Sequence, residues 1–328
     1  MRKETLKGRL FEALIKKLVK KAGFFEFSSE ELTRSKRFHG RGATHQIDIW
    51  GEFCFTIPFI YPLNLLGEAK AYKKQVGLGT ARNFVGVVKD VSEVYSIDTT
   101  KGGISRYSRV GKTRHTHCPV IFSLNGFSKN AEEYMYAQGI YPITYENNSE
   151  IIKIYRKFSG LVNSIEVRNL KVSDKKYFKN LDNLPKISED AKKKEFNRKY
   201  NKLISYLGSI NSYLGMLGGK YIVNIITKKD FTKINPSLIY NLDYSKRFII
   251  KGKRSNLGEF SLSKQFIKYY LADKNNFSKV FSYMDIFILD KEKGFIAKLK
   301  FSENSINEIM QKILPKENET QNTTSNTK

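Results

Sequence analysis

Cysteine is almost absent from this chain: only Cys54 and Cys118 occur in 328 residues. Two thiols supply neither a disulfide framework nor a zinc site of known spacing, which excludes the small secreted folds that depend on them. No run of about 18 apolar residues exists, so we expect no membrane-spanning helix. The N-terminus is charged and lacks an apolar signal core, and the sequence therefore favours a cytoplasmic location.

Acidic residues are also scarce, since 32 of them stand against 58 basic residues and leave a net charge of +26. Residues 1–158 hold 26 basic and 15 acidic residues, and the remainder holds 32 and 17. Because both halves are basic, the charge is not a detachable tail, and a polyanion such as DNA is the natural partner. A lysine-rich composition of the kind that AT-rich genomes encode is the rival explanation, so composition alone does not establish nucleic-acid binding.

Two strand-like segments between residues 40 and 72 carry most of the chemistry. In the first segment polar and apolar residues alternate with the period of two that is typical of a half-buried strand. The alternating pairs are Gln46-Ile47, Asp48-Ile49, Glu52-Phe53 and Cys54-Phe55. In the second segment Glu68 and Lys70 share one face, with small residues between and beside them. Pro58 and Pro62 interrupt the apolar run between the segments, so we expect the chain to turn there and return antiparallel.

Antiparallel pairing of these segments would place the carboxylates of Asp48 and Glu68 roughly 5 Å apart. Carboxylates at that separation repel each other unless a cation lies between them, and Mg²⁺ prefers such oxygen ligands. Lys70 lies on the same face as Glu68, where an ammonium group can orient a water molecule or stabilise the charge that develops on a phosphate. The alternative is a surface strand with ordinary solvated charges.

Asp48 followed by Glu68-Ala69-Lys70 resembles the core of the PD-(D/E)xK nucleases, the restriction-endonuclease-like superfamily. The fuller pattern, Gln46-Ile47-Asp48 with Gly67-Glu68-Ala69-Lys70, is most similar to the Mrr-like branch of restriction endonucleases. Ile47 stands where the name-giving proline would be, at a position that varies within the superfamily. The resemblance covers residues 1 to about 158 and none of the second half.

The resemblance implies hydrolysis of DNA phosphodiester bonds with Mg²⁺, for which Mn²⁺ can substitute. Asp48, Glu68 and the carbonyl group of Ala69 would bind the metal, and Lys70 would activate or orient the attacking water. Glu12 and Gln46 would support the site from outside the ligand set. Glu12 lies at the border of the apolar face of a helix predicted over residues 4–22, from which a carboxylate can reach an adjoining sheet. A solvated helix glutamate is the alternative.

The predicted elements over residues 1–158 follow the order α, β, β, β, α, β, α, β. The elements after the two central strands are a helix at 80–96, a strand at 118–124, a helix at 128–138 and a strand at 140–145. This order is similar to the restriction-endonuclease core, an α/β fold with a mixed sheet flanked by helices and an active site at one sheet edge.

The second half contains no catalytic constellation that the sequence reveals. We expect a junction at 159–186, an α+β domain at 187–314 that serves specificity, a partner or an oligomer, and a disordered tail at 315–328. A long helix is predicted over 188–214. The strands are predicted near residues 221–227, 237–240, 247–250, 281–289 and 294–301.

Basic residues around the two central strands are candidates for contacts with DNA phosphates. Arg41 follows Gly40 in a glycine-rich basic turn, Lys73 follows the second strand, and Arg82 lies in the first turn of the helix predicted at 80–96. The segment 99–117 contains no acidic residue and is predicted to be a loop that embraces nucleic acid. Its candidate residues are Arg106, Arg109, Lys112 and Arg114. Solvated turns and a disordered connector are the alternatives.

The sequence thus predicts a metal-dependent DNA endonuclease that acts in restriction or antiviral defence. Two alternatives stay open: a non-catalytic nucleic-acid-binding module on the same fold, and a junction-resolving or RNA-cleaving nuclease. Cutting both strands with one site per chain usually requires two copies, so a homodimer or a defence-system partner protein is expected. The target sequence and any dependence on methylation are not encoded in a recognisable pattern.

Overall fold

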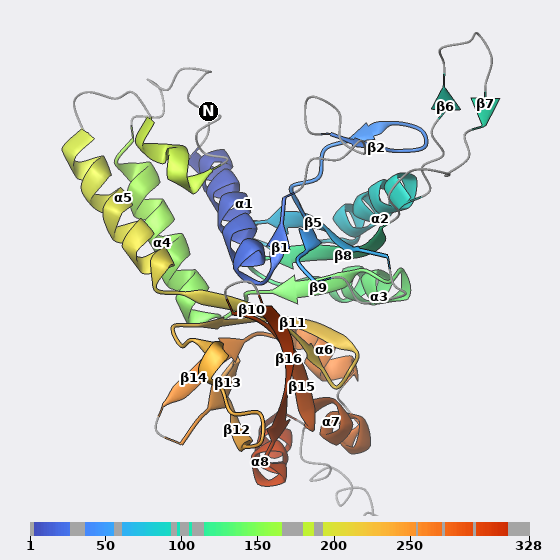
Figure 1. Ribbon diagram of the computed structural model, residues 1–328, viewed down its shortest axis with the longest axis vertical. Coiled ribbons are helices and arrows are strands. Elements are labelled where there is room, and N and C mark those ends of the chain that lie inside the picture. Colours follow the sequence, from blue (N-terminus) through green and yellow to red (C-terminus); the bar gives the residue numbers. More distant parts are fainter. Residues whose placement is uncertain are drawn as a thin grey trace, which may run out of the picture.

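The computed structural model describes residues 3–26, 37–55, 61–92, 97–98, 105–106, 115–165, 180–186, 193–253, 255–270, 273–290 and 293–313. Within these ranges the chain has a mixed α/β architecture, with a five-stranded sheet flanked by helices and a closed seven-stranded barrel beneath it (Figure 1). None of the helices in this described part is long and apolar enough to cross a membrane. The tail expected to be disordered, 315–328, lies outside these ranges.

The five-stranded sheet contains both central strands predicted from the sequence. In spatial order its strands are β1 (Phe24–Phe25), β4 (Ile49–Phe53), β5 (Leu63–Lys70), β8 (Thr116–Ser123) and β9 (Tyr141–Thr144). β4 and β5 are antiparallel, as the interrupting prolines predicted, whereas β8 runs parallel to both β5 and β9. β5 is therefore a central strand, with β4 paired to it as far as Gly67 and β8 paired to it through Lys70. Pairing with β8 fixes the backbone that carries Glu68 and Lys70.

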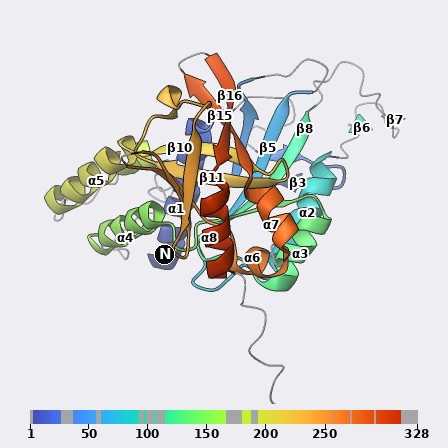
Figure 2. The same ribbon diagram turned by 90° about the horizontal axis from the view of Figure 1, so that it is seen from below.

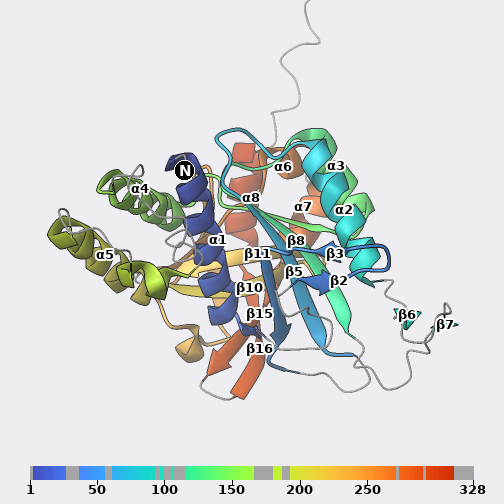
Figure 3. The ribbon, with the colours of Figure 1, turned by 90° about the horizontal axis from the view of Figure 1, so that it is seen from above.

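Helices cover the two faces of this sheet (Figure 3). On one face α1 (Lys3–Lys21) buries its apolar stripe in a core that it shares with β4, β5 and β8. α4 (Ser149–Asn163) packs beside α1, and α5 (Lys193–Gly208) packs beside α4. On the other face lie α2 (Leu78–Ser92) and α3 (Lys129–Ala137). The amphipathic pattern that predicted a helix at 4–22 is confirmed, because its apolar residues are buried in the core.

Two short strand pairs occur where the sequence suggested only turns and loops. β2 (Phe38–His39) pairs with β3 (Thr44–His45), and β6 (Ile97–Asp98) pairs with β7 (Ser105–Arg106). α4 begins at Ser149 and runs through residue 158, where we expected the first domain to end. A short 3₁₀ helix, η3 (Leu181–Lys186), lies next to α1 and α5 within the expected junction.

The second half closes into a barrel. Its strands, in spatial order, are β10 (Asn211–Leu217), β11 (Tyr221–Thr227), β14 (Asn256–Phe260), β13 (Phe248–Lys251), β12 (Ile239–Tyr244), β16 (Lys293–Phe301) and β15 (Tyr283–Asp290). Its helices are α6 (Lys264–Tyr270), α7 (Lys274–Phe281) and α8 (Glu303–Ile313), and η4 (Phe231–Lys233) is a short 3₁₀ turn. Figure 2 shows α8 in front of the barrel strands with α6 and α7 to one side. Buried phenylalanines fill the interior, so the barrel is a packed core.

The helix predicted over 188–214 forms from Lys193 to Gly208, and the prediction was wrong for residues 211–214, which belong to a strand. α5 ends at Gly208, and from Asn211 the chain forms β10, which pairs with β11 over its whole length and with β15 at its end. The apolar residues of this stretch fit either structure locally. Pairing with strands on both sides decides the matter, because it satisfies the backbone hydrogen bonds and buries Tyr213 and Leu217 in the barrel.

Candidate active site

The strand register brings three of the expected site residues together. Ile49 of β4 is paired with Gly67 of β5, and one residue earlier Asp48 lies beside the segment from Glu68 to Lys70. The Oδ2 atom of Asp48 accepts a hydrogen bond from the backbone N–H of Ala69 at 3.2 Å. The Lys70 Nζ atom lies 3.9 Å from the same oxygen and donates a hydrogen bond to Glu68 Oε1.

Gly67 makes this close approach of the strands possible. A Cβ atom on residue 67 would lie 2.9 Å from the Ile49 Cβ atom and 3.1 Å from Cε2 of Phe122 on β8. Real Cβ atoms essentially never approach another atom as closely as 2.9 Å, and 3.1 Å is tighter than most such contacts, so a larger residue would push β5 away from its neighbours. The glycine therefore sets the position of Glu68, the next residue along the strand.

The ammonium group of Lys70 lies close to both carboxylates, where it balances the charge that a metal ion would otherwise balance. Burial and the charge of Asp48 raise the pKa of Glu68, while Lys70 opposes that rise. Burial lowers the pKa of Lys70, but the neighbouring Glu68 and Asp48 outweigh this effect, so its pKa is raised overall. Lys70 is therefore an ammonium ion at neutral pH, which suits it to orient a water molecule or stabilise negative charge and not to remove a proton.

Glu12 of α1 belongs to the same electrostatic site. Burial, followed by the negative charge of Asp48, raises the pKa of Glu12 to about 7, although Lys70 and Lys16 act in the opposite direction. A carboxyl group with this pKa is half protonated near neutral pH, and a nearby cation would make it ionise. The helix residue that sequence periodicity placed at the border of the apolar face is thus close enough to sense Asp48.

Glu12 and Asp48 both line a cavity of about 1070 Å³ between α1, the β1–β4 edge of the sheet and η3. Gln46, which is exposed, also lines it. Several basic side chains surround the two carboxylates: Lys16, Lys17, Lys20, Lys21 and Arg37. Glu26 and Asp182 also line the cavity, and Lys17 Nζ lies 3.5 Å from Asp182 Oδ1, so five basic and four acidic side chains face it. The small excess of positive charge suits a phosphate-bearing substrate.

Lys16 and Trp50 were missed as site residues from the sequence alone. Lys16 lies one helical turn after Glu12, and its Nζ atom is 4.9 Å from the centre of the Trp50 ring. The spacing of four residues could have identified Lys16 as a neighbour of Glu12. Trp50 carried no such signal, because its place in the cavity wall depends on how β4 lies against α1.

The oxygen donors fit a metal ion that is shared with a substrate. Asp48 and Glu68 offer carboxylates, and the Ala69 carbonyl group is a third hard donor. In the described part of the chain, no three side chains of His, Cys, Asp or Glu are placed to hold a metal ion by themselves. Mg²⁺ commonly takes one or two carboxylates and completes its shell with waters and substrate phosphates. The donor set therefore fits Mg²⁺ bound together with a phosphate group.

The glycine-rich turn before β4 is anchored to α2. Asp90 accepts hydrogen bonds from the N–H groups of Gly42 at 2.9 Å and Ala43 at 3.3 Å, and its Oδ2 atom lies 2.6 Å from Nε2 of His45. The hydrogen bond from His45, together with those from the backbone, lowers the pKa of Asp90. His45 thus holds the turn that leads to Asp48, and Arg41 is exposed within that turn.

The structure does not gather the remaining basic candidates around the carboxylates. Lys73 is exposed in the segment that follows β5, and the Arg82 guanidinium lies over the ring of Tyr134 on α3, with 5.9 Å from Cζ to the ring centre. Arg106 falls in β7, of which only the backbone is described. Arg109, Lys112 and Arg114 lie outside the described residues.

Comparison with known proteins gives no functional lead. No protein-family model matches the sequence, and no curated protein does so either. The crystal structure of a protein of unknown function, AF1548, is 14% identical, with an alignment that covers 61% of this chain and 98% of that one. The TM-score is 0.33, which is too low to support a conclusion about the fold.

Proposed function

We propose that this protein is a Mg²⁺-dependent DNA endonuclease that hydrolyses phosphodiester bonds. The observation that carries the proposal is the meeting of Asp48 with Glu68 and Lys70: Asp48 Oδ2 accepts from the Ala69 N–H at 3.2 Å and lies 3.9 Å from Lys70 Nζ. A carboxylate pair with a lysine is the arrangement that metal-assisted attack on a phosphate needs. The basic cavity beside it suits a polyanionic substrate.

Each residue has a distinct part in the proposed reaction. Asp48, Glu68 and the Ala69 carbonyl would hold Mg²⁺, which when bound supplies Lewis-acid stabilisation of the charged phosphate. Lys70, kept charged by its two carboxylate neighbours, would orient the attacking water and stabilise charge on the phosphate. Glu12, with a pKa of about 7, can hold or release a proton near neutral pH. Lys16 and Arg37 would position phosphates in the cavity.

A restriction-endonuclease-like core is the finer description of the fold that we propose. Support comes from the mixed sheet, in which Asp48 directly precedes β4, Glu68 lies on the antiparallel neighbour β5, and β8 pairs with β5 in parallel on its other side. The role in restriction or antiviral defence rests on the resemblance of the motif to the Mrr-like branch. A homodimer or a partner protein would supply the second cut in a duplex.

Plasmid cleavage tests the proposal directly. Purified protein is incubated with supercoiled plasmid, methylated or not, in Mg²⁺, Mn²⁺ or EDTA, and parallel reactions contain linear, branched and RNA substrates. We expect nicked or linear plasmid with Mg²⁺ or Mn²⁺ and none with EDTA. Binding of DNA without cleavage under any metal would favour the non-catalytic module. Cleavage confined to branched DNA or RNA would assign one of the other nuclease classes.

A further inference from the structure

A second basic groove lies away from the catalytic cavity, in the seam between α4 and α5. It has a volume of about 450 Å³ and shares no lining residue with the larger cavity. The groove is lined by Lys157, Asn201, Lys202, Ser205, Tyr206 and Ser209. The lining contains no acidic side chain, while its ammonium, amide and hydroxyl groups can all donate hydrogen bonds to an anion.

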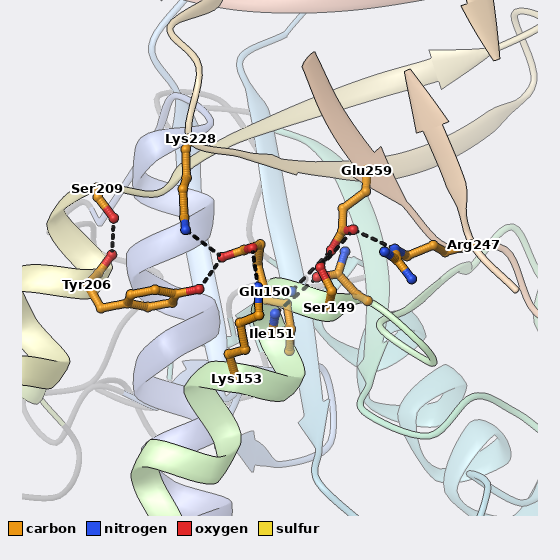
Figure 4. A network of polar contacts seen from close by, with 10 residues as sticks. Ser149, Glu150, Ile151, Lys153, Tyr206, Ser209, Lys228, Arg247 and Glu259 are labelled. Carbon is orange, nitrogen blue, oxygen red and sulfur yellow. Dashed lines mark hydrogen bonds and ion pairs between the residues drawn. The ribbon is translucent and has the colours of Figure 1, made fainter. Parts of the chain in front are cut away.

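Tyr206 is held in place at the edge of this groove. The centre of its ring is 5.1 Å from Lys157 Nζ and 4.9 Å from Lys228 Nζ. Its hydroxyl donates a hydrogen bond to Glu150 (Figure 4). Glu150 also receives a hydrogen bond from Lys153 at 3.0 Å and lies 3.6 Å from Lys228. This neighbouring carboxylate is thus already engaged by Lys153 and Lys228. Among the residues that the structure describes, no carboxylate forms an ion pair with Lys157 or Lys202 of the groove lining.

A row of cations extends the groove along α5. Lys194, Arg198 and Lys202 are spaced four residues apart, so they share one face, and all three are exposed. At 1.5 Å per residue the row is about 12 Å long. Nucleic-acid phosphates advance by about 3.4 Å per nucleotide along one strand, so a row of this length spans three to four of them.

We propose that the α4–α5 groove binds the phosphate backbone of nucleic acid outside the catalytic cavity, through Lys157, Arg198 and Lys202. This inference takes its ligand class from the proposed nuclease function. The groove lies between α4 and α5, and α4 packs against α1, which lines the catalytic cavity (Figure 1). In this proposal one long duplex would engage both. The groove would hold DNA without contributing to the chemistry, and it would raise affinity most at low salt.

The test measures equilibrium binding of a labelled long duplex by fluorescence anisotropy at several salt concentrations without divalent metal. Every protein carries Glu68→Ala so that cleavage cannot interfere. The groove variant adds Lys157→Ala, Arg198→Ala and Lys202→Ala. The matched control adds Lys253→Ala, Lys279→Ala and Lys300→Ala, which remove the same charge from exposed positions on the barrel. Thermal melts verify that both variants fold.

Three lost phosphate contacts should reduce the slope of log affinity against log salt by about 2.7 in the groove variant. Between about 50 and 200 mM salt, the affinity of the parent should therefore fall by a factor about 40 times larger than the factor for the groove variant. The control should keep the parental slope. The inference would be overturned if the parent and the groove variant had equal slopes, or if the slope of the control fell as much as that of the groove variant. It would also be overturned if the parent bound no DNA. If the groove variant shows the reduced slope but the wild-type protein cleaves no DNA, only the nuclease proposal is overturned.

Discussion

The backbone N–H of Ala69 donates a hydrogen bond at 3.2 Å to Oδ2 of Asp48, and this bond joins the two halves of the candidate site. Ala69 lies between Glu68 and Lys70, so the bond fixes Asp48 against both neighbours at once. The same Asp48 oxygen is 3.9 Å from the Lys70 ammonium group. A cation is thus already present between two partly buried carboxylates, and a divalent ion would compete for its place.

We predict that Glu68→Ala and Lys70→Ala each reduce DNA cleavage by at least about 100-fold, because the first removes a metal ligand and the second removes the ammonium group that would orient the attacking water. DNA affinity should change only a few-fold, since the phosphate contacts lie elsewhere. Plasmid cleavage rates and anisotropy titrations measure the two effects separately. Glu133→Ala, an exposed carboxylate on α3, is the matched control. Near-wild-type cleavage by either site variant would remove Glu68 or Lys70 from the mechanism.

Metal binding should stabilise the fold through the same residues. Mg²⁺ and Mn²⁺ at about 100 times their dissociation constant should add about 2.7 kcal/mol to the free energy of unfolding, measured as a rise in Tm. Asp48→Asn should lose most of this gain, because it removes a ligand. Ca²⁺ should also stabilise the protein but support little cleavage, since its looser geometry positions water poorly.

Lys70→Ala should change the metal-induced rise in Tm in the opposite direction from Asp48→Asn, measured in the same melts. Without the ammonium group the carboxylates of Asp48 and Glu68 repel each other, so the metal-free variant should melt at a lower temperature than wild type. Added Mg²⁺ should then produce a larger rise in Tm than in wild type. A rise that is unchanged in Asp48→Asn, or smaller in Lys70→Ala, would contradict the paired-carboxylate metal site.

The buried carboxyl group of Glu132 predicts how the stability of the protein depends on pH. This α3 carboxyl group is 1% exposed, and burial raises its pKa from 4.5 to about 7, although a hydrogen bond from Ser263 acts the other way. The unfolded chain loses this proton near pH 4.5 and the folded chain only near pH 7, so Glu132 costs stability as the pH rises through that range. Glu132→Gln should therefore stabilise the protein by about 1–3 kcal/mol at about pH 8.

The gain should disappear below pH 4.5, where both side chains are neutral in both states. Denaturation curves across the pH range measure it. Glu12→Gln is the informative comparison, because Glu12 has a similar pKa of about 7 but lies near Asp48. Mg²⁺ should reduce the gain for Glu12→Gln and leave the gain for Glu132→Gln unchanged. A pH-independent gain for Glu132→Gln would show that its buried charge is not the cause.

A carboxylate from the barrel anchors the sheet domain. Glu259 on β14 accepts hydrogen bonds from the Ser149 hydroxyl at 2.9 Å, the N–H of Glu150 at 3.1 Å and Arg247 Nε at 2.6 Å (Figure 4). It thus caps the start of α4 while its charge is balanced by Arg247. Glu259→Ala should lower the free energy of unfolding by about 2–4 kcal/mol, because three donors lose their acceptor.

Glu259→Gln is the control for this anchor. It keeps an oxygen for Ser149 and the Glu150 N–H but loses the charge opposite Arg247, so its loss should be about half as large. Chemical denaturation monitored by circular dichroism measures both variants. An alanine variant as stable as wild type would mean that water replaces the carboxylate without cost.

Local patterns in the sequence were enough to predict the strands of the candidate site. Alternation around Asp48, the interrupting prolines and the Glu68-x-Lys70 spacing are properties of a few neighbouring residues, and the β-strand period converts them directly into shared faces. The amphipathic period of α1 worked in the same way and placed Glu12 at a border. In each case one element and its nearest neighbour contain the information.

Tertiary structure decided everything that depends on distant partners. Asn211–Leu217 is a strand because β11 and β15 lie on either side of it, and the barrel closes only when β16 reaches β12. The raised pKa of Glu12 and the position of Lys16 over Trp50 likewise require α1 to pack across the sheet. Periodicity shows which face of a segment is buried, but the partner is chosen by burial and hydrogen bonding summed over the whole chain. For that reason the sequence alone predicted the carboxylates and the lysine as candidate site residues, and only the fold determined the cavity that Glu12 and Asp48 line.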